Sequence, residues 1–165
     1  MTSPTLAPVL TLVLATGLAV VPWPGAMGSG TVMAALVPAV VVHYWTLRRQ
    51  EGLPASIAFL SGLTVDILGG GALGFCALLN LVGWWTGVGC RPWRACFPIG
   101  RWGLAAGAVV LMVAAGWLAA YLAGAAVNPM AELLEAGFWT ILLYPLIVLP
   151  LRLVEGPRRS EAAAA

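Results

Sequence analysis

Residues 59–75 of the chain read FLSGLTVDILGGGALGF, and this stretch decides which fold the sequence predicts. The stretch is strongly apolar, yet it carries one acid, Asp66, followed by three glycines at 69–71. An ionisable side chain in an apolar environment needs a partner or contact with water, because its burial is costly. Glycine tolerates the backbone angles that tight reversals require. Together these residues predict a helical hairpin with an acid beside its turn.

The composition of the whole chain indicates that lipid is its solvent. Of its 165 residues, 61% are hydrophobic and 8% are charged, and residues 1–47 carry no charged side chain. Soluble domains are about a quarter charged. The N-terminus lacks the basic region of a secretory signal, so the first apolar run is expected to be retained. The sequence therefore predicts an all-α polytopic membrane protein with a single transmembrane domain over 1–165.

Six apolar segments have the length of a membrane span, which is roughly 17 to 25 residues. They are separated by glycine, proline and arginine, and prolines and glycines commonly lie at helix ends. We expect spans at about 5–23, 31–47, 53–69, 71–89, 102–124 and 132–153, followed by a flexible C-terminal tail at 156–165.

The arginines give the orientation of this six-helix bundle. All eight follow the second, fourth or sixth span, so six spans place them on one face. Because positive loops face the cytoplasm, both termini are expected to be cytoplasmic. The opposite loops carry only Glu132 and Glu135, beside the sixth span. The inner face is expected to meet anionic lipid or cytoplasmic partners, through Arg48, Arg49, Arg91, Trp93, Arg94 and Arg101.

Asp66 is predicted to lie near the outer surface, just before the glycine turn. The first N–H groups of the following helix have no partner within that helix, and a carboxylate folded back by the turn could accept them. We therefore expect a hairpin cap formed with Gly69, Gly70 and Gly74. Two alternatives stay open, which are a proton or ion site and a contact with a partner protein.

Two further polar side chains lie within the predicted spans. Asn80 falls near the middle of the fourth span and is expected to form an interhelical hydrogen bond. His43 lies about one turn from Arg48 and is expected to form an interhelical hydrogen bond near the inner interface. Small residues spaced four apart allow helices to approach closely, and those expected to pack in this way are Ala15, Ala19, Gly116, Ala120 and Gly124.

The sequence contains no recognisable catalytic, metal or cofactor pattern. It has one histidine, and the six-residue separation of Cys90 and Cys96 does not match zinc-ligand spacing. These cysteines and Cys76 are expected to be small buried side chains. Arginines and tryptophans alternate in CRPWRACFPIGRW at 90–102, but such residues are ordinary anchors at a bilayer surface and do not indicate nucleic-acid binding. We expect no enzyme activity.

Two segments resemble the MreD family, small inner-membrane proteins of the bacterial rod-shape machinery. The segments are PAVVVHYWTLRR at 38–49 and AFLSGLTVDILGGGALGFCALLN at 58–80. The apolar span in the first segment ends in a Tyr-Trp pair, Tyr44 and Trp45, as in that family. The sixth span, WTILLYPLIVLPLRLV at 139–154, is also similar. The matching positions of the family's glycine-rich pattern are Gly62, Leu63, Asp66, Leu68, Gly70, Leu73, Gly74, Ala77 and Leu78.

The resemblance implies a non-enzymatic scaffold of the elongation complex that organises peptidoglycan synthesis and cell shape. It implies binding to an MreC-like periplasmic single-span protein. Indirect partners would be MreB filaments, a RodA-type glycosyltransferase and a class B transpeptidase. The implied fold resembles the substrate-binding subunit of energy-coupling-factor vitamin transporters. Such a transporter subunit is the alternative function, and Ala15 and Ala19 are similar to its Ala-x-x-x-Ala docking face.

Overall fold

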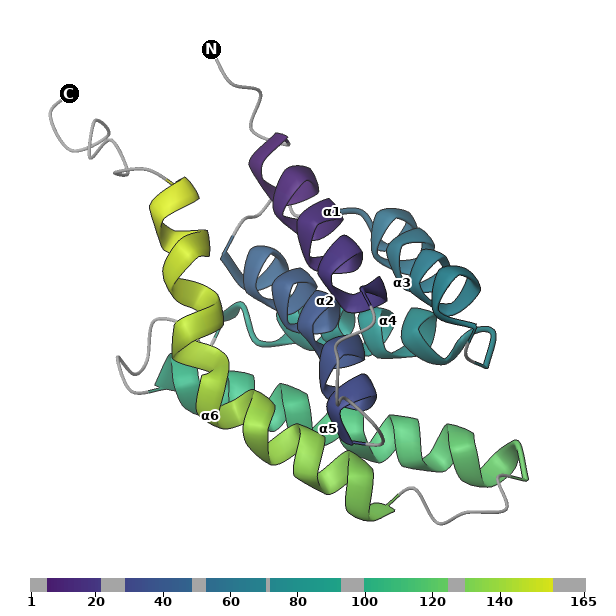
Figure 1. The fold of residues 1–165 in the computed structure, drawn as a ribbon. Helices are drawn as coiled ribbons and strands as arrows, with labels where there is room; N and C mark the ends of the chain where they lie inside the picture. The colour runs from purple at the N-terminus through teal and green to yellow at the C-terminus, as the bar shows by residue number, and fades with distance from the viewer. Residues whose placement is uncertain are drawn as a thin grey trace, which may run out of the picture.

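The computed structural model describes residues 6–21, 29–48, 53–70, 72–92, 100–124 and 130–155, and this part of the chain is entirely helical (Figure 1). Arg49, Trp93, Arg94 and the tail at 156–165 lie outside these ranges, and for Arg101 only the backbone is described. The six helices are α1 (Leu6–Val20), α2 (Ser29–Arg48), α3 (Ala55–Gly69), α4 (Phe75–Gly89), α5 (Gly100–Leu122) and α6 (Met130–Glu155).

Each helix coincides with one predicted span, but several are shorter than expected. Two of the described helical segments, Trp102–Leu122 and Met130–Arg152, are long and apolar enough to cross a membrane. The apolar helices α3 and α4 have 15 residues each. At 1.5 Å per residue each is about 22 Å long, whereas the hydrocarbon core of a bilayer is about 30 Å thick. By length and composition, two of the described helices could therefore cross a membrane.

Helix α2 is the centre of the bundle and contacts each of the other five helices (Figure 1). Its second half is buried all round, from Ala35 to Leu47 apart from the half-buried Val37. That half carries no charged side chain before Arg48. A helix that is apolar on every side is expected to be enclosed by others, and this explains why α2 lies inside.

Glycines allow the closest contacts between helices. A Cβ atom on Gly62 would lie 2.5 Å from Ala77 Cα, and one on Gly83 would lie 2.6 Å from the carbonyl oxygen of Ala39. Both distances are too short for a side chain, so α3 meets α4, and α4 meets α2, almost backbone to backbone. Gly137 similarly faces Val113 of α5 at 2.7 Å.

Most of the residues predicted to pack helices together do so. Ala15 is buried, and Ala19 and Ala120 are half-buried. A Cβ atom added to Gly116 would lie 3.3 Å from the Phe75 ring. Gly124 does not pack against another helix as predicted, because a Cβ atom added there would meet no atom within 4 Å apart from its chain neighbours. Its φ of 70° instead ends α5 in the left-handed conformation that glycine favours.

The described surface is strongly apolar, while several polar side chains lie inside. Exposed residues include Leu10, Leu14 and Leu18, one helical turn apart on α1. The polar or charged side chains in the interior are Thr16, His43, Thr46, Asp66, Asn80, Thr86 and Thr140. Contiguous exposed apolar surface of this kind marks a partner or a membrane in a folded protein.

Candidate functional site

Asp66, in the last turn of α3, closes the hairpin between α3 and α4. Its carboxylate accepts backbone N–H bonds from Gly74 at 2.8 Å, Cys76 at 2.9 Å and Ala77 at 3.4 Å. The side chain is 3% exposed. The contact predicted between Asp66 and the start of the following helix is therefore present. Because the carboxylate faces its own chain, it offers little surface to a partner protein.

The glycines place those donors within reach of the acid. Gly70 and Gly74 have φ angles of 66° and 94°, in the left-handed region. Non-glycine residues rarely adopt such angles, so both positions require glycine. Gly69 is the last residue of α3, is exposed and has open space around it. The chain reversal between α3 and α4 therefore depends on Gly70 and Gly74, and not on Gly69, which was also predicted to take part in the cap.

The N-terminus of α4 is completely hydrogen-bonded as a result. Phe75 donates to the carbonyl of Ala72 at 3.1 Å, and Leu78 donates to that of Gly74 at 2.9 Å. Between them, Cys76 and Ala77 donate to Asp66. The first turn of an α-helix has no acceptors of its own, and here the hairpin supplies them.

Asn80 forms a second polar link between the two helices of the hairpin. Its Nδ2 donates to Ser61 Oγ at 2.9 Å and to the carbonyl of Ala58 at 3.2 Å. The predicted interhelical bond of Asn80 is present, and α3 is its partner. With the glycine contact at Gly62 and the cap at Asp66, it makes the hairpin a rigid unit.

His43 connects α2 to α4 from a fully buried position. Its Nδ1 lies 3.1 Å from Thr86 Oγ1, whose proton is directed to the carbonyls of Val82 and Gly83. The hydroxyl therefore accepts from His43, which assigns the proton to Nδ1. The side chain is 1% exposed. The interhelical polar contact predicted for His43 is therefore present, and Thr86 of α4 is its partner.

The arginine-bearing ends of the helices meet at one end of the bundle. Arg91, after α4, donates from Nε to the carbonyl of Thr46 in the last turn of α2 at 2.8 Å. Trp102, at the start of α5, donates from Nε1 to the carbonyl of Ile141 in α6 at 3.2 Å. Arg48 and Arg152 lie close by, in the last turns of α2 and α6. Arg48 and Arg91 are the members of the predicted basic face whose side chains the structure describes, and they lie at the same end of the bundle.

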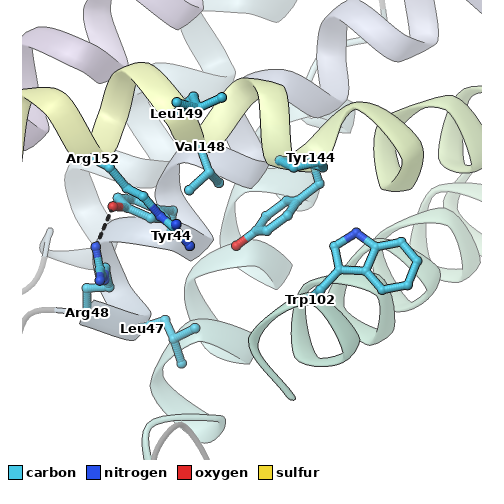
Figure 2. Close-up of a pocket in the computed structure, with 9 residues that line it drawn as sticks. Tyr44, Leu47, Arg48, Trp102, Tyr144, Val148, Leu149 and Arg152 are labelled. Carbon is cyan, nitrogen blue, oxygen red and sulfur yellow. Dashed lines mark hydrogen bonds between the residues drawn. The ribbon is translucent and has the colours of Figure 1, made fainter. Parts of the chain in front are cut away.

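A cavity of about 440 Å³ opens at this end, between α2, α5 and α6 (Figure 2). Arg48 donates to the Tyr44 hydroxyl at 2.7 Å, and its guanidinium carbon lies 5.3 Å from the centre of the Tyr44 ring. The complete lining is Tyr44, Leu47, Arg48, Trp102, Tyr144, Pro145, Val148, Leu149 and Arg152. The sequence-based reasoning did not identify this cavity, although Tyr44 and Arg48 stand four apart on one helix face.

The acids lie at the opposite end of the bundle. Phe75, which begins α4, packs near Gly116 of α5, and Leu133 in the first turn of α6 lies beside the same glycine. The exposed Glu132 and Glu135 belong to that part of α6. Among the described side chains, Arg48, Arg91 and Arg152 therefore lie at one end and Asp66, Glu132 and Glu135 at the other, while Glu155 ends α6 at the arginine end.

Within the described residues, no three His, Cys, Asp or Glu side chains lie close enough together to hold a metal ion. Cys76 is buried in the hairpin as a free thiol. Cys90 follows α4, and burial raises the pKa of its thiol. A thiol with a raised pKa is a poor nucleophile and a poor metal ligand at neutral pH.

Comparison with known protein families, with curated proteins and with solved structures finds no match for this chain.

Proposed function

We propose that the chain is a six-span membrane bundle with both termini in the cytoplasm. Two lines of observation support this arrangement. The described surface is apolar around the bundle, and the side chains of Arg48, Arg91 and Arg152 lie at one end whereas those of Asp66, Glu132 and Glu135 lie at the other. The arginine end is then the cytoplasmic end, in keeping with the positive-inside rule. The short helices α3 and α4 would be accommodated by local thinning of the bilayer, at a modest cost per ångström.

Within that membrane, we propose a non-enzymatic scaffold. The observation that carries this proposal is the use made of the buried polar side chains. Asp66 and Asn80 hold α3 to α4, and His43 holds α2 to α4. Each of these groups is engaged in joining helices, whereas catalysis or transport would require them to face a substrate path.

The scaffold we propose is of the MreD type. In support, several residues that match the MreD pattern have a structural role in the hairpin. Gly62 allows the close contact with Ala77, Asp66 caps α4, and Gly70 and Gly74 adopt left-handed backbone angles. A pattern of glycines around one acid therefore encodes a particular turn, which makes chance agreement less plausible than in a plain apolar segment.

The proposed partner is an MreC-like protein with one span and a periplasmic part. The surface available to it at the outer end is the hairpin tip, where Leu73 is 74% exposed, together with Glu132 and Glu135 of α6. Asp66 stabilises the conformation of this tip by accepting hydrogen bonds from the backbone of Gly74, Cys76 and Ala77. Through that partner the chain would be linked to MreB filaments, a RodA-type glycosyltransferase and a class B transpeptidase.

The alternative, a vitamin-type transporter subunit, has less support. Ala15 is buried in the core, and Ala19 packs beside the cluster formed by Ala35, Val65 and Cys76. These alanines are therefore occupied within the bundle, whereas the alternative would use them to dock a transport module.

The test is affinity purification of the tagged chain in mild detergent, followed by mass spectrometry of the co-purifying proteins. We expect an MreC-like single-span protein, and we expect Leu73→Ser together with Glu132→Ala and Glu135→Ala to reduce its recovery. The matched control is Thr64→Ala, since Thr64 is exposed on α3 and its hydroxyl bonds within the same helix. Recovery of an ATPase-driven transport module in place of this partner would refute the scaffold proposal.

A further inference from the structure

Helix α6 contains two prolines within its 26 residues, Pro145 and Pro150. Proline has no backbone N–H, so it cannot donate to the carbonyl four residues before it, and its ring bends the helix at that point. The carbonyls that lose their ordinary helical donor are those of Ile141 and Leu146. In Figure 1, α6 changes direction near the middle of its length, in the part of the helix that contains Pro145. The bend in α6 therefore has proline as its cause.

A side chain of α5 replaces one of the two missing donors. Trp102, in the first turn of α5, donates from Nε1 to the carbonyl of Ile141 at 3.2 Å. Its indole N–H thus takes the place of the backbone N–H that Pro145 lacks. A carbonyl freed by proline in a membrane helix needs a donor from a neighbouring helix, because lipid offers none. The bond therefore joins α5 to α6 at the position of the bend.

The two parts of α6 on either side of the bend have different neighbours. Before the bend, Gly137 faces Val113 of α5. Beyond it, Val148 lines the cavity together with Tyr44 of α2, and Pro145 belongs to the same lining. The angle of α6 at Pro145 therefore determines how far the second part of the helix stands from α2, and with it the width of the cavity.

The length of α6 gives a reason for the bend in a membrane. Its 26 residues would form a straight helix about 39 Å long, whereas the hydrocarbon core of a bilayer is about 30 Å thick. A helix that is too long for the bilayer tilts or kinks. In the proposed membrane arrangement α6 therefore crosses the bilayer in a tilted or bent form, and the bend is a conformation that a neighbouring helix can hold or release.

We propose that Pro145 is a hinge in α6 and that Trp102 is the latch that holds this hinge in its bent position. With the bond from Trp102 formed, the part of α6 beyond Pro145 lies beside α2, and the cavity has its observed volume of about 440 Å³. When the bond is broken, the Ile141 carbonyl loses this donor and the same part of α6 moves relative to α2, which changes the cavity. The Trp102 side chain is 50% exposed, so it can leave the carbonyl without opening the buried core. This inference goes beyond the proposed scaffold and does not depend on the proposed protein partner.

The first experiment is a double-mutant cycle on the full chain, in which unfolding by SDS in mixed micelles is followed by circular dichroism. Trp102→Phe keeps an aromatic ring but removes the N–H donor, and it is measured in the parent chain, in Pro145→Ala and in Pro150→Ala. Pro145→Ala restores a backbone donor for the Ile141 carbonyl. Pro150→Ala is the matched control, because the carbonyl whose donor it restores is that of Leu146.

We expect Trp102→Phe to raise the unfolding equilibrium constant about tenfold in the parent chain, as for an acceptor that loses its partner. In the Pro145→Ala background the increase should be less than about twofold, since position 145 then supplies the donor and the two changes are coupled. In the Pro150→Ala background it should again be about tenfold. An equal increase in all three backgrounds, or no increase in the parent chain, would overturn the latch.

The second experiment tests whether α6 moves, by measuring distances between spin labels in a chain whose three cysteines are replaced by alanine. One pair of labels joins α5 to the part of α6 beyond the hinge, through Leu111→Cys and Leu149→Cys. The control pair joins α5 to the part before the hinge, through Leu111→Cys and Leu134→Cys, and all three leucines are exposed. We expect Trp102→Phe to broaden the distance distribution of the first pair only. An unchanged first pair, or equal broadening of both pairs, would overturn the hinge. Neither experiment needs a protein partner, so its failure is separate from failure of the scaffold proposal.

Discussion

Replacing Asp66 with alanine should destabilise the hairpin more than any change on its surface. The substitution removes the acceptor for Gly74, Cys76 and Ala77 and leaves these three backbone N–H groups at the start of α4 without partners. Two of these bonds are short, at 2.8 and 2.9 Å. A hydrogen bond to a charged group contributes about 1.5–3 kcal/mol. Since alanine also removes the cost of burying a carboxylate, we expect a net loss of about 2–4 kcal/mol in the free energy of unfolding.

Asp66→Asn gives a graded comparison. The amide keeps one carbonyl oxygen, which can still accept the Cys76 N–H, but its NH₂ group then faces the donors of Gly74 and Ala77. We expect this variant to lose about 1–2 kcal/mol, close to one neutral hydrogen bond. The measurement is unfolding by SDS in mixed micelles, followed by tryptophan fluorescence. Thr64→Ala serves as the control on the exposed face of α3.

A second readout locates the effect in the hairpin. Cys76 is buried beside Asp66, so opening of the hairpin should expose its thiol. In a background with Cys90→Ser and Cys96→Ser, maleimide should label Cys76 faster in Asp66→Ala than in the parent chain. The capping argument fails if Asp66→Ala unfolds at the same SDS fraction as Thr64→Ala and labels no faster.

Three further predictions concern packing, polar contacts and topology. Gly62→Ala should lower the free energy of unfolding by about 1–3 kcal/mol through overpacking against Ala77. Gly103→Ala, on the open face of α5, should be neutral or stabilising by up to about 1 kcal/mol. SDS unfolding of the two variants compares them, and equal effects would contradict the close contact at Gly62. Asn80→Ala should cost about 0.5–2 kcal/mol by loss of its bonds to α3, and an unchanged unfolding midpoint would count against those bonds. In a chain free of native cysteines, a cysteine at Leu73 should react with an impermeant maleimide from outside the cell and one at Arg158 should not; the opposite pattern would reverse the proposed orientation.

The sequence was sufficient to predict where the helices lie. The glycine, proline and arginine breaks between apolar runs set the six predicted spans, and each helix overlaps its span to within a few residues. The Asp66 cap could also be predicted, because the acid, the glycine turn and the new helix are close together in the chain. Orphan N–H groups at a helix start need an acceptor, and Asp66 was the one acid nearby.

Contacts between distant segments could not be predicted in the same way. The partner of His43 is Thr86, 43 residues away, and nothing in the local pattern connects them. The sequence predicted an interhelical hydrogen bond for His43 but could not identify the helix or the residue that forms it. Gly124 showed the small-residue spacing of a packed helix face, but its role is to end α5. The cavity likewise depends on how α2, α5 and α6 converge, which the sequence does not specify.

The acid in the apolar stretch and the shortness of the helices around it have one explanation. A 15-residue helix is about 22 Å long, so in the proposed membrane arrangement the start of α4 does not extend far beyond the hydrocarbon core of the bilayer. Backbone N–H groups left there without water cost several kcal/mol each. Asp66 accepts those of Cys76 and Ala77, and the turn accepts the others. A short hairpin in lipid thus needs an internal acceptor at its turn, and glycine at 70 and 74 is what brings the donors to it.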